Sequence, residues 1–479
     1  MKIRFKFKVF AMLLCVIFSL SLQACSSMNS FMLNFVKEDE KADYVMDKAD
    51  ENLSKANSYR CEIDGNFTGK LEGKEFEVSV KTTEIIVNPE TDKLIHRTQT
   101  EQVLSYDNGS QTTVETLSEG YENGKMFLTS EANEKKQRIW SEISAKEYTK
   151  YMENSSDSSF PDEEDAATKI YRKEEDGSIT LIYKDFSKEE LEAFEADISG
   201  ILAFFGDGCD LADLELTVSI TDDFYPETVS LDIRFKGAAD AEDIPVFTMK
   251  AEYRDINKAQ APDPINLTEF KQVGDIRYLH KFDDKYTELS NSNEGEFVLE
   301  IESEVTSAAR IQRNHEYESV NFKRYDGNCK YTISTQIDGK KYEIRYANGE
   351  ERVYLIKEKS GFMLEDTYEM LSTTKKSQKE AEAYLRSLLN PMSFSKKDVV
   401  DITVSENVEN LVIFELDTVS NESFELVAQQ LNGTLVSASY TVAVEFEKDN
   451  LSEVETVVSL TVSTSEGEIK VNQLYRQTF

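Results

Sequence analysis

The sequence predicts an α+β fold of two tandem domains, each a curved antiparallel β-sheet, an open half-barrel, covered by a few amphipathic helices. Three observations lead to this prediction. Long stretches alternate between apolar and polar residues, which is typical of strands with one buried face. Shorter stretches carry apolar residues at helical spacing, with charged residues between them. Several short signatures of the first half recur in the second half in the same order.

The N-terminus has the pattern of a secretory leader. Basic residues precede an apolar run over residues 9–22, which is too short to span a bilayer comfortably. Leu22-Gln23-Ala24-Cys25 follows, and this resembles the lipobox of bacterial lipoproteins, although Gln23 is not the small residue usual at that position. The resemblance implies a signal peptide over residues 1–24 and a tether over residues 25–38. It also implies a lipid on the Cys25 thiol, with the protein on the extracytoplasmic face of the cell membrane. The alternative is an ordinary secretory leader with a coincidental cysteine.

The charge of the chain excludes one class of partner. The formal net charge is −37, and loss of the basic leader would make it more negative. Such a surface repels phosphate backbones, so we expect no nucleic-acid partner. It also repels anionic lipid head groups, so we expect the membrane to be reached through the anchor alone. The simplest interpretation of the acidity is a solvated exterior.

The cysteines give no framework for folding or metal binding. Apart from Cys15 in the leader and Cys25, the chain has Cys61, Cys209 and Cys329, which are far apart in sequence. This spacing fits neither a disulfide scaffold nor a zinc site. We expect buried reduced thiols, with a Cys61–Cys209 bridge as the alternative.

The first half alternates between helical and strand patterns. Residues 40–57 carry apolar side chains every three or four positions, and alternation begins at Tyr59. Asn-Gly pairs predict tight hairpins within this strand region. Helical spacing returns over residues 144–151 and 187–205, and residues 214–253 again have the pattern of strands.

Four signatures predict that the second half repeats this plan. Tyr121-Glu122-Asn123-Gly124 corresponds to Tyr346-Ala347-Asn348-Gly349, and Tyr253-Arg254 to Tyr475-Arg476. Ser144 and Ser377 each precede a glutamate by three residues, which is the form of a helix capping box. Ser187 and Ser420 complete the set, and the two serines of each half are 43 residues apart. Matching order and spacing favour an internal duplication.

Composition places the domain boundaries. We predict a first domain over residues 39–260, a linker over residues 261–268 that contains Pro262 and Pro264, and a second domain over residues 269–479. Residues 155–165 are rich in serine and acids and predict an exposed insertion. A shorter helix is expected over residues 276–289.

The order of anchor, helix, long meander, helices and closing strands resembles the LolA/LppX-like lipoproteins. The resemblance covers about residues 40–257 and, less completely, 270–479. It implies that a lipid or acyl chain is held between sheet and helices. The wall of such a cavity would be apolar helix residues, namely Leu191, Phe194, Ile198, Ile201, Phe205, Tyr384, Leu388, Phe424 and Val427.

The sequence lacks the common motifs of catalysis and metal binding. It contains no His-Glu-x-x-His, no Cys-x-x-Cys and no Gly-x-Ser-x-Gly, and its three histidines lie in different segments. We therefore expect no enzymatic activity, no cofactor and no metal. The leading hypothesis is a membrane-tethered protein that binds a hydrophobic ligand. The alternative is a structural or interaction module of the cell envelope, with a solid core and an acidic surface that meets a partner.

Overall fold

A computed structural model describes most of the chain as two compact units. One unit ends at Phe270 and the other begins at Lys271. The structure describes residues 36–37 and 40–479 except 72–73, 90, 107–108, 110, 133–134, 156–165, 188–190, 192–193, 195–209, 237–245, 309, 326–327, 338–339, 358–366, 390–397, 406–407, 409, 419–421 and 466. The predicted leader, the lipidation site Cys25 and the insertion at 156–165 thus lie outside the described residues.

The first unit, unit 1, is mostly β-strand. Its described helices are α3 (Lys41–Ser54) and α4 (Ala145–Ser155), with a 3-10 turn at Leu267–Glu269. Its strands are β1 (Ser58–Leu71), β2 (Lys74–Val87), β3 (Ile95–Tyr106), β4 (Gln111–Glu122), β5 (Lys125–Ala132), β6 (Lys135–Glu142), β7 (Ala166–Lys173), β8 (Ile179–Phe186), β9 (Asp210–Ile220), β10 (Pro226–Lys236) and β11 (Val246–Arg254).

The second unit, unit 2, has the same kinds of element. Its described helices are α7 (Arg277–Asn291), α8 (Gln378–Leu389) and α9 (Glu422–Gln430). Its strands are β12 (Lys271–Gln272), β13 (Glu294–Thr306), β14 (Ile311–Tyr325), β15 (Asn328–Ile337), β16 (Lys340–Ala347), β17 (Glu350–Lys357), β18 (Thr367–Lys375), β19 (Val399–Val404), β20 (Leu411–Leu416), β21 (Gly433–Glu447), β22 (Asn450–Thr464) and β23 (Gly467–Thr478).

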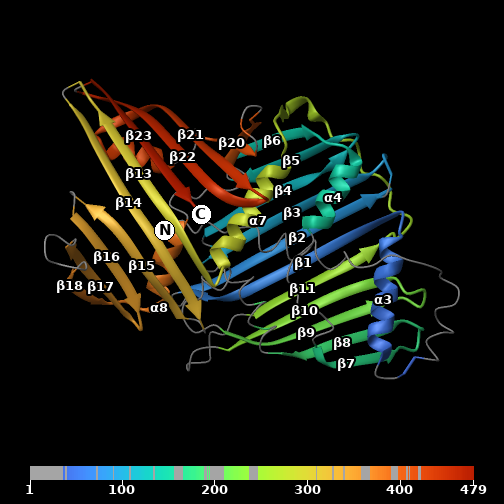
Figure 1. The fold of residues 1–479 in the computed structure, drawn as a ribbon. Coiled ribbons are helices and arrows are strands. Elements are labelled where there is room, and N and C mark those ends of the chain that lie inside the picture. The colour runs from blue at the N-terminus through green and yellow to red at the C-terminus, as the bar shows by residue number, and fades with distance from the viewer. Residues whose placement is uncertain are drawn as a thin grey trace. The chain divides into compact units, whose positions relative to one another are not determined.

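Both units have one large antiparallel sheet with the same strand order. In unit 1 the order is β6-β5-β4-β3-β2-β1-β11-β10-β9-β8-β7, and in unit 2 it is β18-β17-β16-β15-β14-β13-β23-β22-β21-β20-β19. In each, a meander of six strands follows the first helix, and the last strand returns to pair with the first strand of that meander (Figure 1). The coarse class predicted from sequence, large antiparallel sheets with few helices, is confirmed.

The apolar core lies between one face of each sheet and the helices. In unit 1, α3 buries Val45, Ala49 and Leu53 in one cluster with strand residues such as Leu181, Tyr183 and Leu231. In unit 2, α8 buries Ala381, Leu385 and Leu389 against Leu299, Val320 and Ile333. Because neighbouring residues of a strand point to opposite faces, the polar residues between these positions lie on the other face of each sheet.

The strand registers relate the two sheets position by position. Tyr121 and Tyr346 both precede an Asn-Gly turn; His96 pairs with the first and Tyr331 with the second. Continuing this pairing across the strands makes Leu181 equivalent to Val412, Tyr183 to Phe414 and Val218 to Val444. All six of these residues are buried. The repeat is therefore present in the hydrogen-bonding pattern itself.

One predicted correspondence is wrong. Cys61 and Glu62 pair with Tyr253 and Glu252. Their equivalents are Phe297 and Val298: Val298 pairs with Thr478, and the Phe297 ring contacts that of Phe479 at 6.3 Å. Tyr253 is thus equivalent to Phe479, and the match of Tyr253-Arg254 to Tyr475-Arg476 is displaced by four residues. Tyr-Arg is a common pair in this sequence because apolar and polar residues alternate along the strands. The two dipeptides therefore match in sequence although they do not occupy equivalent positions in the strand register.

The predicted turns at Asn123 and Asn348 and the predicted caps at Ser144 and Ser377 are confirmed, whereas the turn at Asn108 and the cap at Ser187 involve residues outside those described. Asn123 and Gly124 have φ of 51° and 80°, and Asn348 and Gly349 have 54° and 80°, as a tight hairpin turn requires. Ser144 Oγ accepts from the Glu147 amide at 3.2 Å, and a Glu147 carboxylate oxygen accepts from the Ser144 amide at 3.1 Å. In unit 2 the same bonds join Ser377 and Glu380 at 3.2 and 2.8 Å. The expected helix at 276–289 is α7.

The segment predicted as a linker is attached to unit 1. Arg97 donates to the Asp263 carbonyl at 2.8 Å, and the Ile265 amide donates to the Glu122 carboxylate at 3.3 Å. Arg138 forms an ion pair with Glu269. These contacts hold the proline-containing stretch along β3, β4 and β6. Within the described part of the chain, no helix combines the length and the hydropathy needed to cross a bilayer.

Candidate functional site

The predicted cavity residues that the structure describes are packed into the cores. Phe194 is 1% exposed and belongs to the unit 1 cluster, with Leu191 packed against it. In unit 2, Leu388 is 9% exposed in the α8 cluster and Tyr384 packs against that cluster. Phe424 is 4% exposed and contacts the Tyr440 ring edge-on at 6.0 Å, and Val427 is half-buried. Ile198, Ile201 and Phe205 lie outside the described residues.

An aromatic cluster lies at one end of the unit 1 core. The Phe67 ring is 6.2 Å from Phe76, 6.3 Å from Phe235 and 6.2 Å from Phe247, in edge-on or tilted contacts. These four residues come from β1, β2, β10 and β11 and share the buried cluster that contains Phe194. The four rings therefore form one aromatic patch on the apolar face of the sheet.

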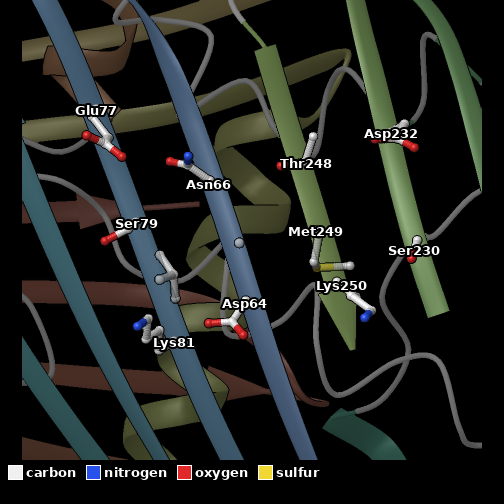
Figure 2. A pocket seen from close by; sticks show the side chains of 12 residues that line it. Asp64, Asn66, Glu77, Ser79, Lys81, Ser230, Asp232, Thr248, Met249 and Lys250 are labelled. Atoms are coloured by element: carbon white, nitrogen blue, oxygen red, sulfur yellow. The ribbon is translucent and has the colours of Figure 1, made fainter. Parts of the chain in front are cut away.

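A polar groove lies on the opposite face of the same four strands. Figure 2 shows its side chains, which come from β1, β2, β10 and β11. Its volume is about 410 Å³. The small residues Gly65, Ser79 and Ser230 leave the space, and longer polar side chains surround it: Asp64, Asn66, Glu77, Lys81, Asp232, Thr248 and Lys250. Asp64 is the central charge, since it is in register with Lys81 on one side and Lys250 on the other.

Most charged side chains that line this groove form no ion pair with another described residue. Among the described residues, Asp64, Glu77, Lys81 and Asp232 form no ion pair, and all four are exposed. Lys250 is paired with Glu252 at 2.6 Å. Neighbouring exposed charges on a sheet usually pair with each other. Free acids and a free ammonium in one depression can instead bind a polar ligand through charge-assisted hydrogen bonds.

The equivalent position of unit 2 also carries a charged cluster. The register makes Glu300 equivalent to Asp64 and Arg476 equivalent to Lys250. Glu302 and His315, a directly opposed pair, are equivalent to Asn66 and Ser79. One ligand atom from each of Glu300, Glu302 and His315 lies within 4.8 Å of the other two, so these side chains could hold a metal ion. Both sheets thus have a polar constellation at the same point.

Sequence reasoning did not find either cluster. Each is assembled from residues on several strands, and only the strand register brings them together. Alternation along the strands places Glu300, Glu302 and His315 on the polar face. It does not predict that Glu302 and His315 are opposite each other, because this depends on the register of the two strands. The sequence pattern alone does not predict the cluster, because the pairing of β13 with β14 is needed to bring the three side chains together.

A second polar pocket of about 350 Å³ lies at the other side of unit 1. It is formed where the attached segment that ends at Phe270 crosses β4, β5 and β6. The ion pair between Arg138 and Glu269 lies in its wall. Because its charges are already paired, we do not regard it as the ligand site.

Comparison with known proteins does not identify a family. No family model matches the chain, and no curated protein matches it. An outer membrane lipoprotein-sorting protein domain from Vibrio parahaemolyticus is 10% identical, with a TM-score of 0.16, over 41% of this chain and 89% of that one. A DUF3598-family protein of unknown function from Nostoc punctiforme is 7% identical, with a TM-score of 0.13, over 89% of this chain and 96% of that one. Transferrin Binding Protein B from Haemophilus parasuis is 8% identical, with a TM-score of 0.12, over 88% of this chain and 76% of that one. Likenesses at these scores carry no argument about function.

Proposed function

We propose that the chain is a membrane-anchored, extracytoplasmic and non-catalytic binding protein, and that the polar groove of unit 1 is its ligand site. The observation that carries the proposal is the set of unpaired charges around Asp64 in a depression of the sheet. The apolar face of the same sheet is covered by α3 and filled by buried side chains, so the accessible chemistry lies on the polar face. The lipobox at Cys25 supports the anchor, and the lack of catalytic motifs supports the absence of catalysis.

The groove favours a ligand that is polar and partly cationic. Three acids, Asp64, Glu77 and Asp232, surround it, and Lys81 is the unpaired base. An amino group of the ligand would lie among the acids, and a carboxylate would lie near Lys81. Peptide-bearing cell-wall polymer has both groups, and a lipid-anchored protein outside the membrane would meet it there.

The test is titration of the full chain with soluble cell-wall fragments that carry peptide stems, followed by calorimetry. We expect Asp64→Asn and Lys81→Ala each to weaken binding at least tenfold. Glu175→Gln, an exposed acid in the turn between β7 and β8 and outside the groove, is the matched control and should bind as the parent does. Equal binding by parent, Asp64→Asn and Lys81→Ala would reject the groove as the site.

The anchor has a test of its own. Cys25→Ala should move the chain from the membrane fraction to the soluble fraction of cells, because the acyl chains that hold it there would be missing. A variant that stays in the membrane fraction would show that Cys25 does not anchor the protein.

A second candidate function is carriage of an apolar ligand, as the LolA/LppX resemblance implies. The observation that favours it is the aromatic patch around Phe67, which lies in the same buried cluster as Phe194. A lipid chain would lie against this patch on the apolar face of the sheet. Solvent extraction of the full chain purified from membranes tests this, because the covalent anchor remains on the protein. Stoichiometric lipid in the extract supports carriage, and its absence rejects it.

A further inference from the structure

We propose that Glu300, Glu302 and His315 of unit 2 form a binding site for a divalent transition-metal ion. This site is separate from the groove of unit 1, and the proposal does not rest on the function proposed above. The three residues do not form a known metal-binding motif in the sequence.

The register of β13 and β14 brings the three ligands to one face. Glu302 and His315 are directly opposed, and Glu300 lies two residues from Glu302 and so points the same way. Their ligand atoms all lie within 4.8 Å of one another, and His315 Nε2 is 2.8 Å from a Glu300 carboxylate oxygen. Strands hold such side chains more rigidly than loops do.

The donor set selects the kind of metal. Imidazole with carboxylates suits Zn²⁺ and its neighbours in the first transition row, whereas Ca²⁺ and Mg²⁺ take oxygen ligands. Three protein ligands leave a position for water. Glu302 and His315 are exposed and Glu300 is partly exposed, so an ion can reach them from solvent.

The surrounding charges favour a cation. Arg476 lies 3.3 Å from the second Glu300 oxygen, but it is also bound to Glu455 at 2.7 Å and is 3.6 Å from Glu453. Arg313 is paired with Glu304. Among the described residues Glu302 forms no ion pair. The acids around the site therefore outnumber the bases, and the local field attracts a divalent ion.

Unit 1 provides a built-in comparison. At the equivalent positions it has Asp64, Asn66 and Ser79, so one carboxylate remains and the imidazole is replaced by a hydroxyl. The backbone pairing is the same, and only the side chains differ. Unit 1 should therefore bind Zn²⁺ much more weakly than unit 2.

The experiment is calorimetric titration of the full chain, purified without a histidine tag, with ZnCl₂ under reducing conditions. We expect one ion per chain, and we expect His315→Ala and Glu302→Gln each to weaken binding at least tenfold. Glu296→Gln, an exposed acid on the same strand β13 outside the site, is the matched control and should bind as the parent does. Far-UV circular dichroism checks that every variant is folded.

A second measurement keeps the proposal testable if a variant fails to fold. X-ray absorption of the zinc-loaded parent should show one imidazole nitrogen together with oxygen ligands. Absence of binding by the parent, undiminished binding by folded His315→Ala, or a spectrum without imidazole scattering would each overturn the site.

Discussion

His96 Nδ1 and Tyr148 Oη lie 2.6 Å apart, and the two side chains are 3% and 2% exposed. The Tyr148 ring also stacks on Tyr121 at 4.7 Å, and His96 Nε2 is 3.0 Å from Glu84. This contact fixes α4 to the sheet of unit 1. In unit 2 the position of His96 is taken by Tyr331, whose hydroxyl donates to Glu351 at 2.5 Å. The equivalent positions His96 and Tyr331 are therefore stabilised by different hydrogen bonds in the two units.

Loss of the Tyr148 hydroxyl should destabilise unit 1. Tyr148→Phe keeps the ring stack but leaves His96 Nδ1 buried without this partner, which costs about 1–3 kcal/mol. Urea unfolding followed by circular dichroism measures the change in free energy. Tyr317→Phe, at an exposed tyrosine on β14, is the control and should have almost no effect. Equal stability of the two variants would contradict the role of this bond.

The capping box of α8 should contribute to the stability of unit 2. Ser377→Ala removes the acceptor for the Glu380 amide, at a cost of about 1 kcal/mol. Ser387→Ala, on the same helix, is the control, because that hydroxyl only donates to the Tyr384 carbonyl. Hydrogen exchange of the first turn of α8 reports the effect, and unchanged protection in Ser377→Ala would count against the cap.

The cap should also depend on pH. Hydrogen bonds from the Ser377 amide and hydroxyl lower the pKa of the Glu380 carboxyl below its usual 4.5. The contribution is therefore present above pH 4.5 and is lost as the pH falls through the lowered pKa of the folded state. Protection of the first turn of α8 should decline in that acidic range and should not decline between pH 6 and 8.

Glu318 should cost stability at neutral pH. Its Oε2 is buried without a hydrogen-bond partner among the described residues, and desolvation, helped by nearby Glu316, raises the pKa of the carboxyl above 4.5. The folded state thus holds the proton more tightly than the unfolded state, and stability falls as the pH rises through the interval between the two pKa values. Glu318→Gln should raise the urea midpoint at pH 7 and have little effect at pH 4. Glu296→Gln, exposed on β13, should change neither, and a lower midpoint for Glu318→Gln at pH 7 would refute this account.

The two described thiols should be inert in the folded protein. Cys61 and Cys329 are free and buried, and Cys209, the partner in the alternative bridge, lies outside the described residues. Burial raises the pKa of the Cys61 thiol far above its usual range and that of Cys329 to about 12, so neither forms the reactive thiolate at pH 8. Iodoacetamide with peptide mapping should label both only after denaturation. Rapid labelling of either thiol in the native protein would contradict this prediction.

Local patterns predicted the elements well. Apolar spacing found α3, α4, α7 and α8 to within a few residues, because each helix has a single buried stripe. The Ser-x-x-Glu and Asn-Gly signatures found the caps and turns, because those depend on neighbouring residues alone. The repeat followed from their spacing.

The register and the polar clusters could not be predicted in this way. The match of Tyr253 to Tyr475 failed because a strand can shift by an even number of residues and keep the same faces. The groove around Asp64 and the cluster around His315 each depend on partners from neighbouring strands. Only the pairing shows that these two places are equivalent.

The shared strand order of the two sheets means that the chain contains the same scaffold twice. Alternate residues of each strand form the apolar face and the polar face of the sheet. A substitution on the polar face therefore does not alter the side chains that pack in the core. The two units can therefore expose different polar groups at equivalent positions, as Asp64 and Ser79 differ from Glu300 and His315, while both keep a buried apolar face.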